Sequence, residues 1–260
     1  MFKILKYSFS DFLRGRWSYA YFTFYSLLGF VLLFLNNDIS KAILTLLNII
    51  IVLRPLIATV FGIMYYYQSK EFTELLLAQP IKRSRIFMGQ YVGVSLSLTL
   101  SLLLGLGIPF VLYGLFRSAE IFHFSLLLVV GTFLNFIFVA LSFCIALSTE
   151  NKIKGFGFAI LMWLFMAVIY DGIFLISLVL FNDYPLDKFS LVMTMFNPID
   201  LSRILILLEL DISALLGYTG AVFQKFFGSA LGMTLSIAAL FVWVLLPTLL
   251  MLRKARRKDF

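Results

Sequence analysis

The sequence has 260 residues, of which 62% are hydrophobic and 13% charged, with 30 phenylalanines and a mean hydropathy of +1.02. Soluble domains are about 45–50% apolar, so this composition excludes an ordinary soluble protein and predicts a membrane protein. Apolar segments cover most of the chain and leave no room for a soluble domain with its own core. We therefore expect a single transmembrane domain over residues 1–260, and any catalytic module would be another polypeptide.

The net charge of +8 is explained by membrane topology rather than by nucleic acid, which we do not expect as a partner. Lys and Arg are enriched in the cytoplasmic loops of membrane proteins. Here most basic residues lie before the first predicted span or after the second, fourth and sixth. We therefore predict a multi-pass protein embedded in membrane lipid, with both termini in the cytoplasm. Residues 1–17 lack the apolar core and cleavage site of a secretory signal.

An amphipathic helix is predicted before the first span and would lie along the membrane surface. Its apolar side would consist of Phe2, Leu5, Phe9 and Phe12, and its polar side of Lys3, Lys6, Ser10 and Arg14. Trp17 marks the boundary with the membrane, where tryptophan is enriched. The alternative is an ordinary basic flank.

Six stretches are long and apolar enough to be transmembrane helices, because crossing about 30 Å of hydrocarbon takes about 20 helical residues. The sequence therefore predicts an all-α polytopic membrane protein with six transmembrane helices. The predicted spans are Ser18–Leu35, Leu44–Tyr66, Tyr91–Leu115, Phe124–Leu147, Gly155–Leu180 and Gly228–Leu252.

Two charged residues lie near the middle of predicted spans, Arg54 in the second and Asp171 in the fifth. A charge at that depth costs about 2.5–3.5 kcal/mol on insertion scales, so neither side chain should face lipid. One hypothesis is an ion pair between them or a polar route for a substrate. The alternative is that each lines water or caps a neighbouring backbone group.

The segment Gln68–Gln90 lies between the second and third spans, on the predicted cytoplasmic side. A short amphipathic helix is predicted there, with Ser69 as N-cap, Glu71 in the first turn and Pro80 at its end. Its apolar side would hold Phe72, Leu75, Leu76 and Gln79, its charged side Lys70, Glu71 and Glu74, and the basic residues Lys82, Arg83 and Arg85 follow. Such a helix fits a groove on a cytoplasmic partner. The alternative is a solvated loop whose charges only set the topology.

A long outer segment, Phe181–Phe227, separates the fifth and sixth spans. It contains two apolar runs, SLVMTMF and LSRILILLEL, each too short to cross the membrane, so we expect an outer re-entrant helical hairpin. Between them, Asn197 or Asp200 can cap the second helix and Pro198 favours its first turn. The hairpin would plug the outer end of the bundle or bind an extracytoplasmic protein; alternatively it is a lid that only adds stability.

No metal site and no catalytic residue is predicted. The chain has one cysteine, Cys144, and one histidine, His123, without a metal-ligand spacing. It also lacks a phosphate-binding loop and the common hydrolase motifs. Two glycine pairs, Gly89 with Gly93 and Gly228 with Gly232, would allow close helix packing within one chain or at a dimer seam.

Several of these segments together resemble ABC type-2 transporter permeases. The resemblance rests on DFLRGRW (Asp11–Trp17), on EFTELLLAQPIKRSRIFMGQYVG (Glu71–Gly93) and on the outer hairpin before the last span. It implies a permease in the bacterial inner membrane that forms a homodimer and binds a separate cytoplasmic ATPase, which would hold ATP and Mg²⁺. The implied coupling residues are Ser69, Glu71, Phe72, Glu74, Leu75, Pro80, Arg83 and Arg85.

A narrower resemblance is to the permeases of nitrous oxide reductase maturation systems. It rests on residues 147–181 and on FNPIDLSRIL, where Asn197, Pro198, Asp200 and Arg203 match the family's pattern. It implies a periplasmic β-helical copper-handling partner, with copper or a sulfur species transported or force transmitted. Two alternatives stay open: an ABC exporter permease for a lipid, peptide or drug, and a secondary transporter or channel that works without an ATPase.

Overall fold

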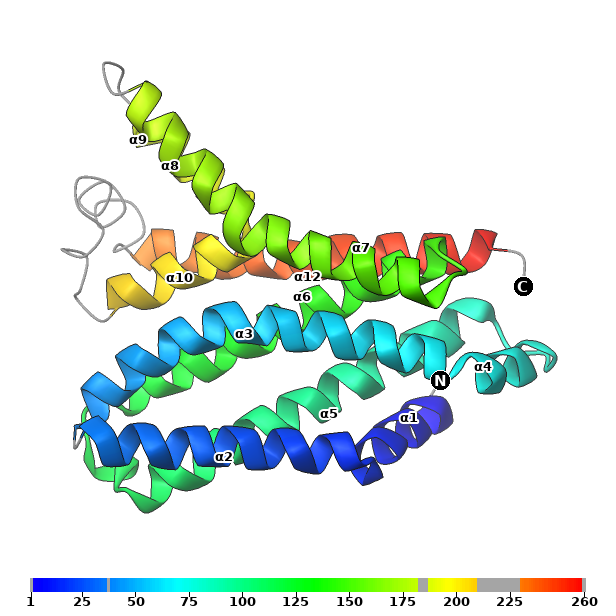
Figure 1. Ribbon diagram of the computed structural model, residues 1–260, viewed down its shortest axis with the longest axis horizontal. Helices are drawn as coiled ribbons and strands as arrows, with labels where there is room; N and C mark the ends of the chain where they lie inside the picture. The colour runs from blue at the N-terminus through cyan, green and yellow to red at the C-terminus, as the bar shows by residue number, and fades with distance from the viewer. Residues whose placement is uncertain (1, 37, 182–186, 210–229, 259–260) are drawn as a thin grey trace.

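The computed structural model describes residues 2–36, 38–181, 187–209 and 230–258, and the regular elements within these ranges are all helical (Figure 1). They are α1 (Phe2–Arg14), α2 (Arg16–Asn36), α3 (Ile39–Gln68), α4 (Lys70–Leu77), α5 (Arg83–Leu112), η1 (Leu115–Arg117), α6 (Ile121–Ser148), α7 (Lys152–Leu164), η2 (Phe165–Ile169), α8 (Tyr170–Leu180), α9 (Asp187–Met195), α10 (Pro198–Glu209) and α12 (Ala230–Arg257).

Six helical stretches in the described ranges are long and apolar enough to cross a membrane. They are Trp17–Asn36, Ile39–Gln68, Arg83–Leu112, Ile121–Ser148, Lys152–Leu180 and Gly232–Arg257. The predicted fold class and number of spans are thus confirmed. Most of the helices extend beyond the predicted spans, because hydropathy marks only the part of a helix that meets hydrocarbon.

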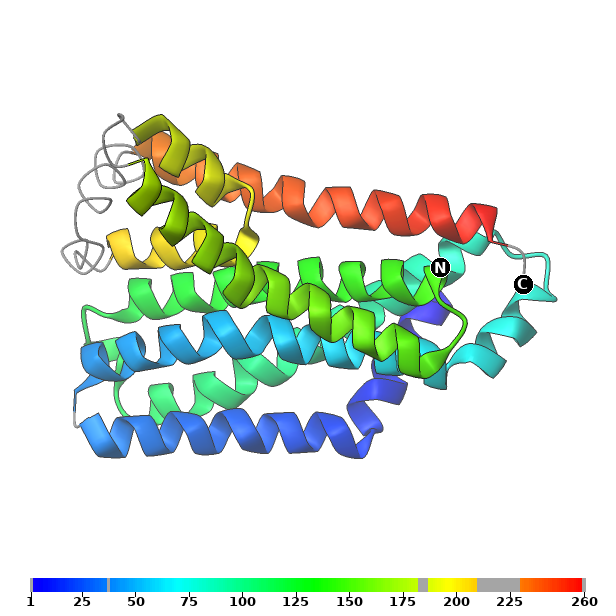
Figure 2. The same cartoon turned by 45° about the horizontal axis from the view of Figure 1, so that its top comes forward.

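Five of the long helices, α2, α3, α5, α6 and α12, run side by side along the length of the molecule (Figures 1 and 2). Among these five helices, the most extensive contacts join α3 with α6, α2 with α5, and α12 with α6. Both termini lie with α4 at one end of this bundle (Figure 1). We call it the basic end, because it carries α1, α4, the start of α5 and the last turn of α12; the opposite end is the far end.

Helix α1 packs on α5 at two glycines. A Cβ atom at Gly93 would lie 2.7 Å from Cβ of Ser8, and one at Gly89 would lie 3.0 Å from Cγ2 of Ile4. These distances leave no space for a side chain, so Gly89 and Gly93 serve packing within one chain. Ile4 and Ser8 form the buried contact. Each comes one residue before a member of the predicted apolar side, Leu5 and Phe9. Of the second glycine pair, Gly228 lies outside the described residues.

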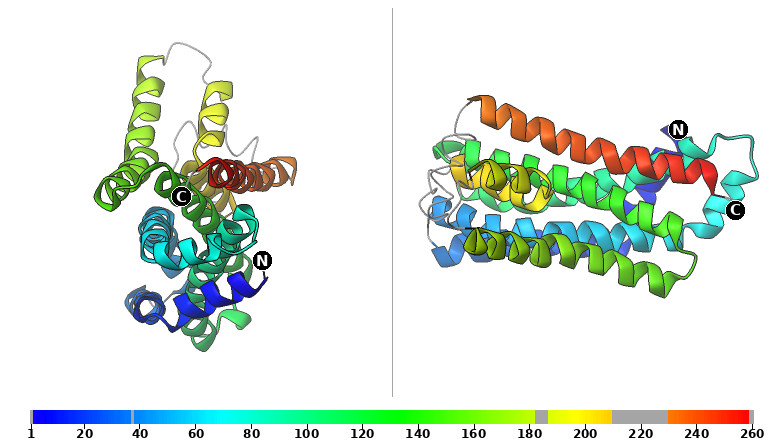
Figure 3. Two further views of the ribbon diagram at one scale, coloured as in Figure 1. Left: turned by 90° about the vertical axis from the view of Figure 1, so that its right-hand side faces the viewer. Right: turned by 90° about the horizontal axis from the view of Figure 1, so that it is seen from above.

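The fifth span, Lys152–Leu180, lies at the edge of the bundle. It contains the π-helical turn η2 between α7 and α8. Only 6% of its most apolar window is buried, against 50% or more in the second, third and fourth spans. Beyond η2, α8 diverges from the bundle, and α9 rises on the same side (Figure 3, left). The described part of this chain therefore leaves most of the fifth span uncovered.

Candidate functional site

Helix α4 is held against the bundle by its buried residue Thr73. Gln90 of α5 donates from Nε2 to Oγ1 of Thr73 at 2.8 Å, and this hydroxyl donates to the carbonyl of Ser69 at 2.7 Å. On the neighbouring position, the ring of Phe72 stacks on Tyr7 of α1 at a centroid distance of 4.5 Å. Two other elements therefore fix the position of this short helix.

The exposed side of α4 differs from the predicted apolar side. Leu75 is 69% exposed and shares the outer surface with Glu71 and Glu74, whereas Phe72 faces the chain itself. The difference arises because Gln90 and Tyr7 supply partners for Thr73 and Phe72 within the protein. The outer surface of α4 therefore combines one apolar side chain with two carboxylates and with Lys70, whose Nζ lies 3.8 Å from Oε1 of Glu74.

The two predicted ends of α4 have different outcomes. Ser69 precedes the helix, but its backbone angles (φ −87°, ψ 11°) are not those of an extended N-cap and its side chain makes no cap hydrogen bond. Its hydroxyl instead donates to the carbonyl of Tyr66 at 3.4 Å, so Ser69 occupies the predicted N-cap position but its side chain does not cap the helix. Pro80 is exposed and follows the last helical residue, Leu77, as predicted.

Two of the basic residues after α4, Arg83 and Arg85, belong to α5, and Lys82 directly precedes this helix. Arg83 is the first residue of α5 and donates to the carbonyl of Lys258 at 2.6 Å, while Arg85 is exposed in the same turn. Arg256 of α12 donates from Nε to Oγ of Ser84 at 2.9 Å. These contacts join the start of α5 to the end of α12.

Beside η2, in the half of the molecule away from the basic end (Figure 1), α9 and α10 meet at a bend of 113° that is organised by Asn197. The side chain of Asn197 accepts from the N–H of Ile199 at 3.0 Å and donates at 2.8 Å both to Met166 in η2 and to Asp200. Asn197 is therefore the cap of α10, Pro198 is its first residue and Asp200 lies in its first turn. The bend is tied to the π-helical turn of the fifth span.

Two further hydrogen bonds secure the bend through the end of α9. Tyr170 of α8 donates to the carbonyl of Met193 at 2.6 Å, and the indole of Trp243 in α12 donates to that of Met195 at 3.0 Å. The fifth and sixth spans therefore both hold the end of α9. Sequence patterns did not single out Tyr170 or Trp243, because a hydroxyl or indole in an apolar span has no distinctive spacing.

Asp171 and Arg203 form an ion pair across the far end. Nη1 of Arg203 lies 3.0 Å from Oδ2 of Asp171 and 3.6 Å from Oδ1 of Asp200. The predicted pair between Asp171 and Arg54 is therefore wrong. Asp171 lies just after η2 and pairs with a residue of α10. Sequence periodicity alone does not show that α10 packs beside the fifth span.

Arg54 is fully buried in the bundle. Its Nη1 donates to the hydroxyl of Tyr25 in α2 at 3.1 Å, and its Nη2 donates to the carbonyl of Leu98 in α5 at 2.7 Å. The guanidinium also lies 5.5 Å from the centre of the Tyr25 ring. Arg54 thus caps a neighbouring backbone group and joins three helices.

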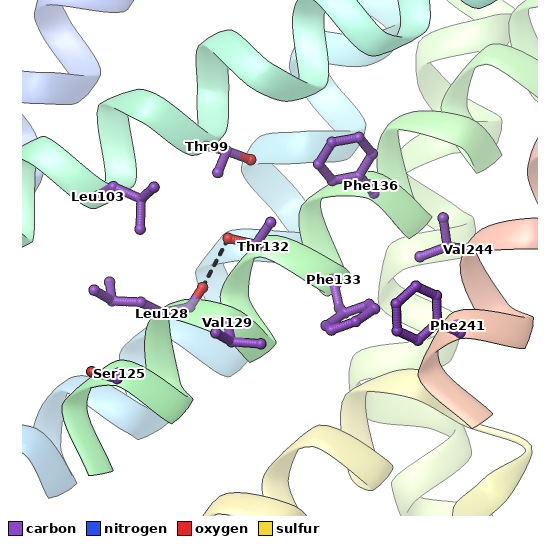
Figure 4. A pocket seen from close by; sticks show the side chains of 10 residues that line it. All are labelled: Thr99, Leu103, Ser125, Leu128, Val129, Thr132, Phe133, Phe136, Phe241 and Val244. Carbon is purple, nitrogen blue, oxygen red and sulfur yellow. Dashed lines mark hydrogen bonds between the residues drawn. The ribbon is translucent and has the colours of Figure 1, made fainter. Parts of the chain in front are cut away.

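An apolar pocket of about 610 Å³ lies among α5, α6 and α12 (Figure 4). Its lining residues are Thr99, Leu103, Ser125, Leu128, Val129, Thr132, Phe133, Phe136, Phe241 and Val244. The Thr132 hydroxyl donates to the carbonyl of Leu128 at 2.9 Å and is therefore satisfied within its helix. The pocket suits an apolar group.

The described residues contain no group of three or more His, Cys, Asp or Glu side chains arranged to hold a metal ion. The soft ligand Cys144 is buried, and its thiol donates to the carbonyl of Pro247 at 3.3 Å. In this position it packs α6 against α12.

Comparison with known proteins extends the resemblance seen in the motifs. No protein-family model matches the chain. The chain is 26% identical over 221 residues to the probable ABC transporter permease protein NosY of Stutzerimonas stutzeri. The matched region covers 79% of this chain and 80% of that protein. The chain is likewise 26% identical over 222 residues to the protein of the same name from Pseudomonas aeruginosa, with the same shares covered. Across most of its length the chain thus resembles the permease proteins of ABC transporters and is close to NosY.

Proposed function

We propose that this chain is the non-catalytic permease subunit of an ABC transporter in the bacterial inner membrane, with both termini in the cytoplasm. The similarity to two NosY proteins and the six apolar spans support this function. A separate cytoplasmic ATPase would bind ATP and Mg²⁺ and hydrolyse the nucleotide. Permease subunits of this kind convert motion of the ATPase into changes across the membrane.

The ATPase would bind the outer surface of α4, and this helix is the observation that carries the proposal. Glu71, Glu74 and Leu75 offer two carboxylates and one apolar contact to a groove. Phe72 and Thr73 would act from inside, by holding α4 on α1 and α5. Arg83 and Arg85 would lie beside the docked protein, and Pro80 ends the docking helix.

Contacts within the chain offer a route from α4 to the far end. Thr73 bonds Gln90, and the next residue, Tyr91, accepts from Thr248 of α12 at 3.3 Å. Further along α12, Trp243 bonds the end of α9. Packed helices and hydrogen bonds of this kind can transmit a displacement, so movement of α4 would be felt at the bend.

Nitrous oxide reductase maturation is the process that we propose for this permease, because its relatives carry the name NosY and its motifs match that system. A periplasmic β-helical copper-handling protein would bind at the far end. Asn197 and Asp200 are buried, so they would set the shape of this surface, together with Pro198 and Arg203, rather than be its main contacts. Copper or a sulfur species would be moved, or force transmitted.

A homodimer is part of this proposal, and the exposure of the fifth span supports it. Only 6% of the most apolar window of that span is buried within the described chain. A second copy would cover one side of it and lipid the other.

The pocket in Figure 4 favours a second function, export of an apolar cargo such as a lipid, a hydrophobic peptide or a drug. Its volume of about 610 Å³ lies in the range of small-molecule sites. The same fold and the same ATPase would serve this function. It differs from the first in requiring no protein partner at the far end.

The experiment is a pull-down of the native ATPase from detergent-solubilised membranes with tagged permease. We expect Glu71→Lys with Glu74→Lys to abolish recovery of the ATPase, because the change reverses both exposed carboxylates of α4. Mass spectrometry of the same samples would identify a periplasmic protein bound to the unmodified chain.

The control is Glu150→Lys, the same reversal of a carboxylate at one other exposed position of the basic end. It should leave ATPase recovery unchanged. If the α4 variant recovers as much ATPase as the control does, α4 is not the docking helix. If the unmodified chain brings down an ATPase but no periplasmic protein, the apolar exporter replaces the maturation function.

A further inference from the structure

A second pocket lies at the basic end, between the last turns of α6 and α12. It has a volume of about 580 Å³. Its lining residues are Leu147, Ser148, Leu250, Arg253, Lys254, Arg257 and Lys258. Four of the seven are cationic and none is acidic, so the pocket is suited to an anion.

The spacing of its residues on α12 gives the pocket a direction. Arg253 and Lys254 lie three and four residues after Leu250, and Arg257 lies four and three residues after them, so all four share one side of the helix. On the same side, one turn toward the middle of the span, lies Leu246, which is 53% exposed, and Leu250 is 49% exposed. An apolar track in the membrane thus leads directly into a cationic cluster at its end.

The cations differ in how they are held. Lys254 donates to the hydroxyl of Ser148 and to the carbonyl of Cys144, which fixes it at the end of α6. Arg253 and Arg257 are exposed, and the part of the chain that the structure describes gives neither an ion pair. Burial lowers the pKa of Lys258, and Glu150 opposes that shift while Lys70 adds to it. Glu150 thus acts on Lys258 from outside the lining of the pocket.

We propose that this pocket binds the phosphate headgroup of an anionic phospholipid, with one acyl chain lying along Leu250 and Leu246. Arginine forks match phosphate oxygens in a bidentate manner, and basic pockets between spans at a membrane face are suited to acidic headgroups. The continuous apolar track favours a lipid over an acidic protein surface. An acidic protein surface would contact only the cationic residues and would make no use of the apolar track. This proposal does not depend on an ATPase partner.

The test is native mass spectrometry of the purified full chain in detergent, titrated with phosphatidylglycerol. We expect one molecule to bind with clear preference over phosphatidylcholine of the same acyl chains. Arg253→Gln with Arg257→Gln should weaken phosphatidylglycerol binding roughly 30-fold, since each cation near the surface contributes about a factor of five. Arg253→Lys with Arg257→Lys keeps both charges and should retain the preference for the anionic lipid.

The control is Arg256→Gln, which removes one positive charge from the same turn, half the change of the double variant. Arg256 does not line the pocket and donates instead to Ser84, so its loss should leave lipid binding close to that of the unmodified chain. Equal binding by the Arg253/Arg257 variant and the control overturns the proposal. Displacement of the lipid by excess inorganic phosphate would assign a free-anion site, and unchanged lipid binding with reduced ATPase recovery would assign the cluster to an acidic protein surface; either result contradicts the proposal.

Discussion

Arg54 illustrates how a single residue is tolerated in an apolar span. Removing its charge from water costs several kcal/mol, and the side chain is fully buried. This cost is offset by two hydrogen bonds, to Tyr25 and to Leu98, and by the aromatic ring of Tyr25. The residue therefore acts as a cross-link among α2, α3 and α5.

A double-mutant cycle tests this cross-link. We expect Tyr25→Phe to lower the apparent free energy of unfolding by about 1.5 kcal/mol and Arg54→Met by about 2 kcal/mol, because each removes a buried charge-assisted hydrogen bond. The double variant should lose less than the sum, by about 1 kcal/mol. The measurement is the unfolding midpoint in detergent. Strictly additive effects would show that the two side chains are not coupled.

Sequence alone located Arg54 and Asp171 as polar residues inside spans, but it could not pair them correctly. Hydropathy reports depth in the membrane and is insensitive to how each helix is rotated. The partner of Asp171 is Arg203, which α10 brings to the fifth span only because of the bend at Asn197. A pairing of this kind depends on the tertiary arrangement of the elements.

At the scale of elements, the bend between α9 and α10 depends on Asn197 more than on any ion pair. We expect Asn197→Ala to destabilise the far end by about 3 kcal/mol, because it removes the α10 cap and leaves buried partners unsatisfied. Hydrogen exchange in α10 should become faster, and the unfolding midpoint should fall.

Asn48→Ala provides the control for the bend. Asn48 also donates to a backbone carbonyl, that of Leu44 at 3.3 Å, but on an exposed helix surface. Its replacement should change stability by no more than about 0.5 kcal/mol. Similar exchange rates in α10 for the two variants would show that Asn197 does not hold the bend.

Helix α4 depends on one hydroxyl for its attachment to α5. Thr73→Val keeps the shape of the side chain but leaves buried Gln90 without its partner, at a cost of about 1–3 kcal/mol. We expect faster hydrogen exchange in α4 and weaker recovery of the ATPase, although the exposed residues of α4 are unchanged. Thr45→Val is the control, since Thr45 donates to Lys41 on an exposed surface. If exchange in α4 is the same in both variants, Thr73 does not hold the helix.

The elements were predictable to different degrees for physical reasons. Pro80 and the spacing of Glu71 and Glu74 indicated a short helix at α4, and Asn197 and Pro198 indicated the start of α10. The side of α4 that faces outward differs by one residue from the predicted side, because tertiary partners, Tyr7 and Gln90, decide which side is buried. The π-helical turn η2 was not foreseen, since FMAVI has no residue that distinguishes it from an α-helix.

At the scale of the whole molecule, hydropathy and the distribution of basic residues predicted the number of spans, because both reflect the solvent around each segment. They do not specify which helices are neighbours. The exposed fifth span is a consequence of that arrangement, and it divides into two exposed sides on α7. One side carries Phe158, and the other carries Gly157, Ile160 and Leu164.

The proposed dimer predicts that these two sides behave differently. A Cβ atom at Gly157 would meet nothing within 4 Å, and small residues allow helices to approach closely in a membrane. We therefore expect the second copy to lie on the side of Gly157 and lipid on the other.

In a Cys144→Ser background, which removes the single cysteine and keeps a donor for Pro247, Ile160→Cys and Leu164→Cys should form disulfide-linked dimers in native membranes. Phe158→Cys is the control, since Phe158 is 57% exposed against 43% for Ile160, and it should stay monomeric on a non-reducing gel. Cross-linking on both sides, or only through the control position, would contradict this dimer, because a specific interface between two copies can cover only one side of α7.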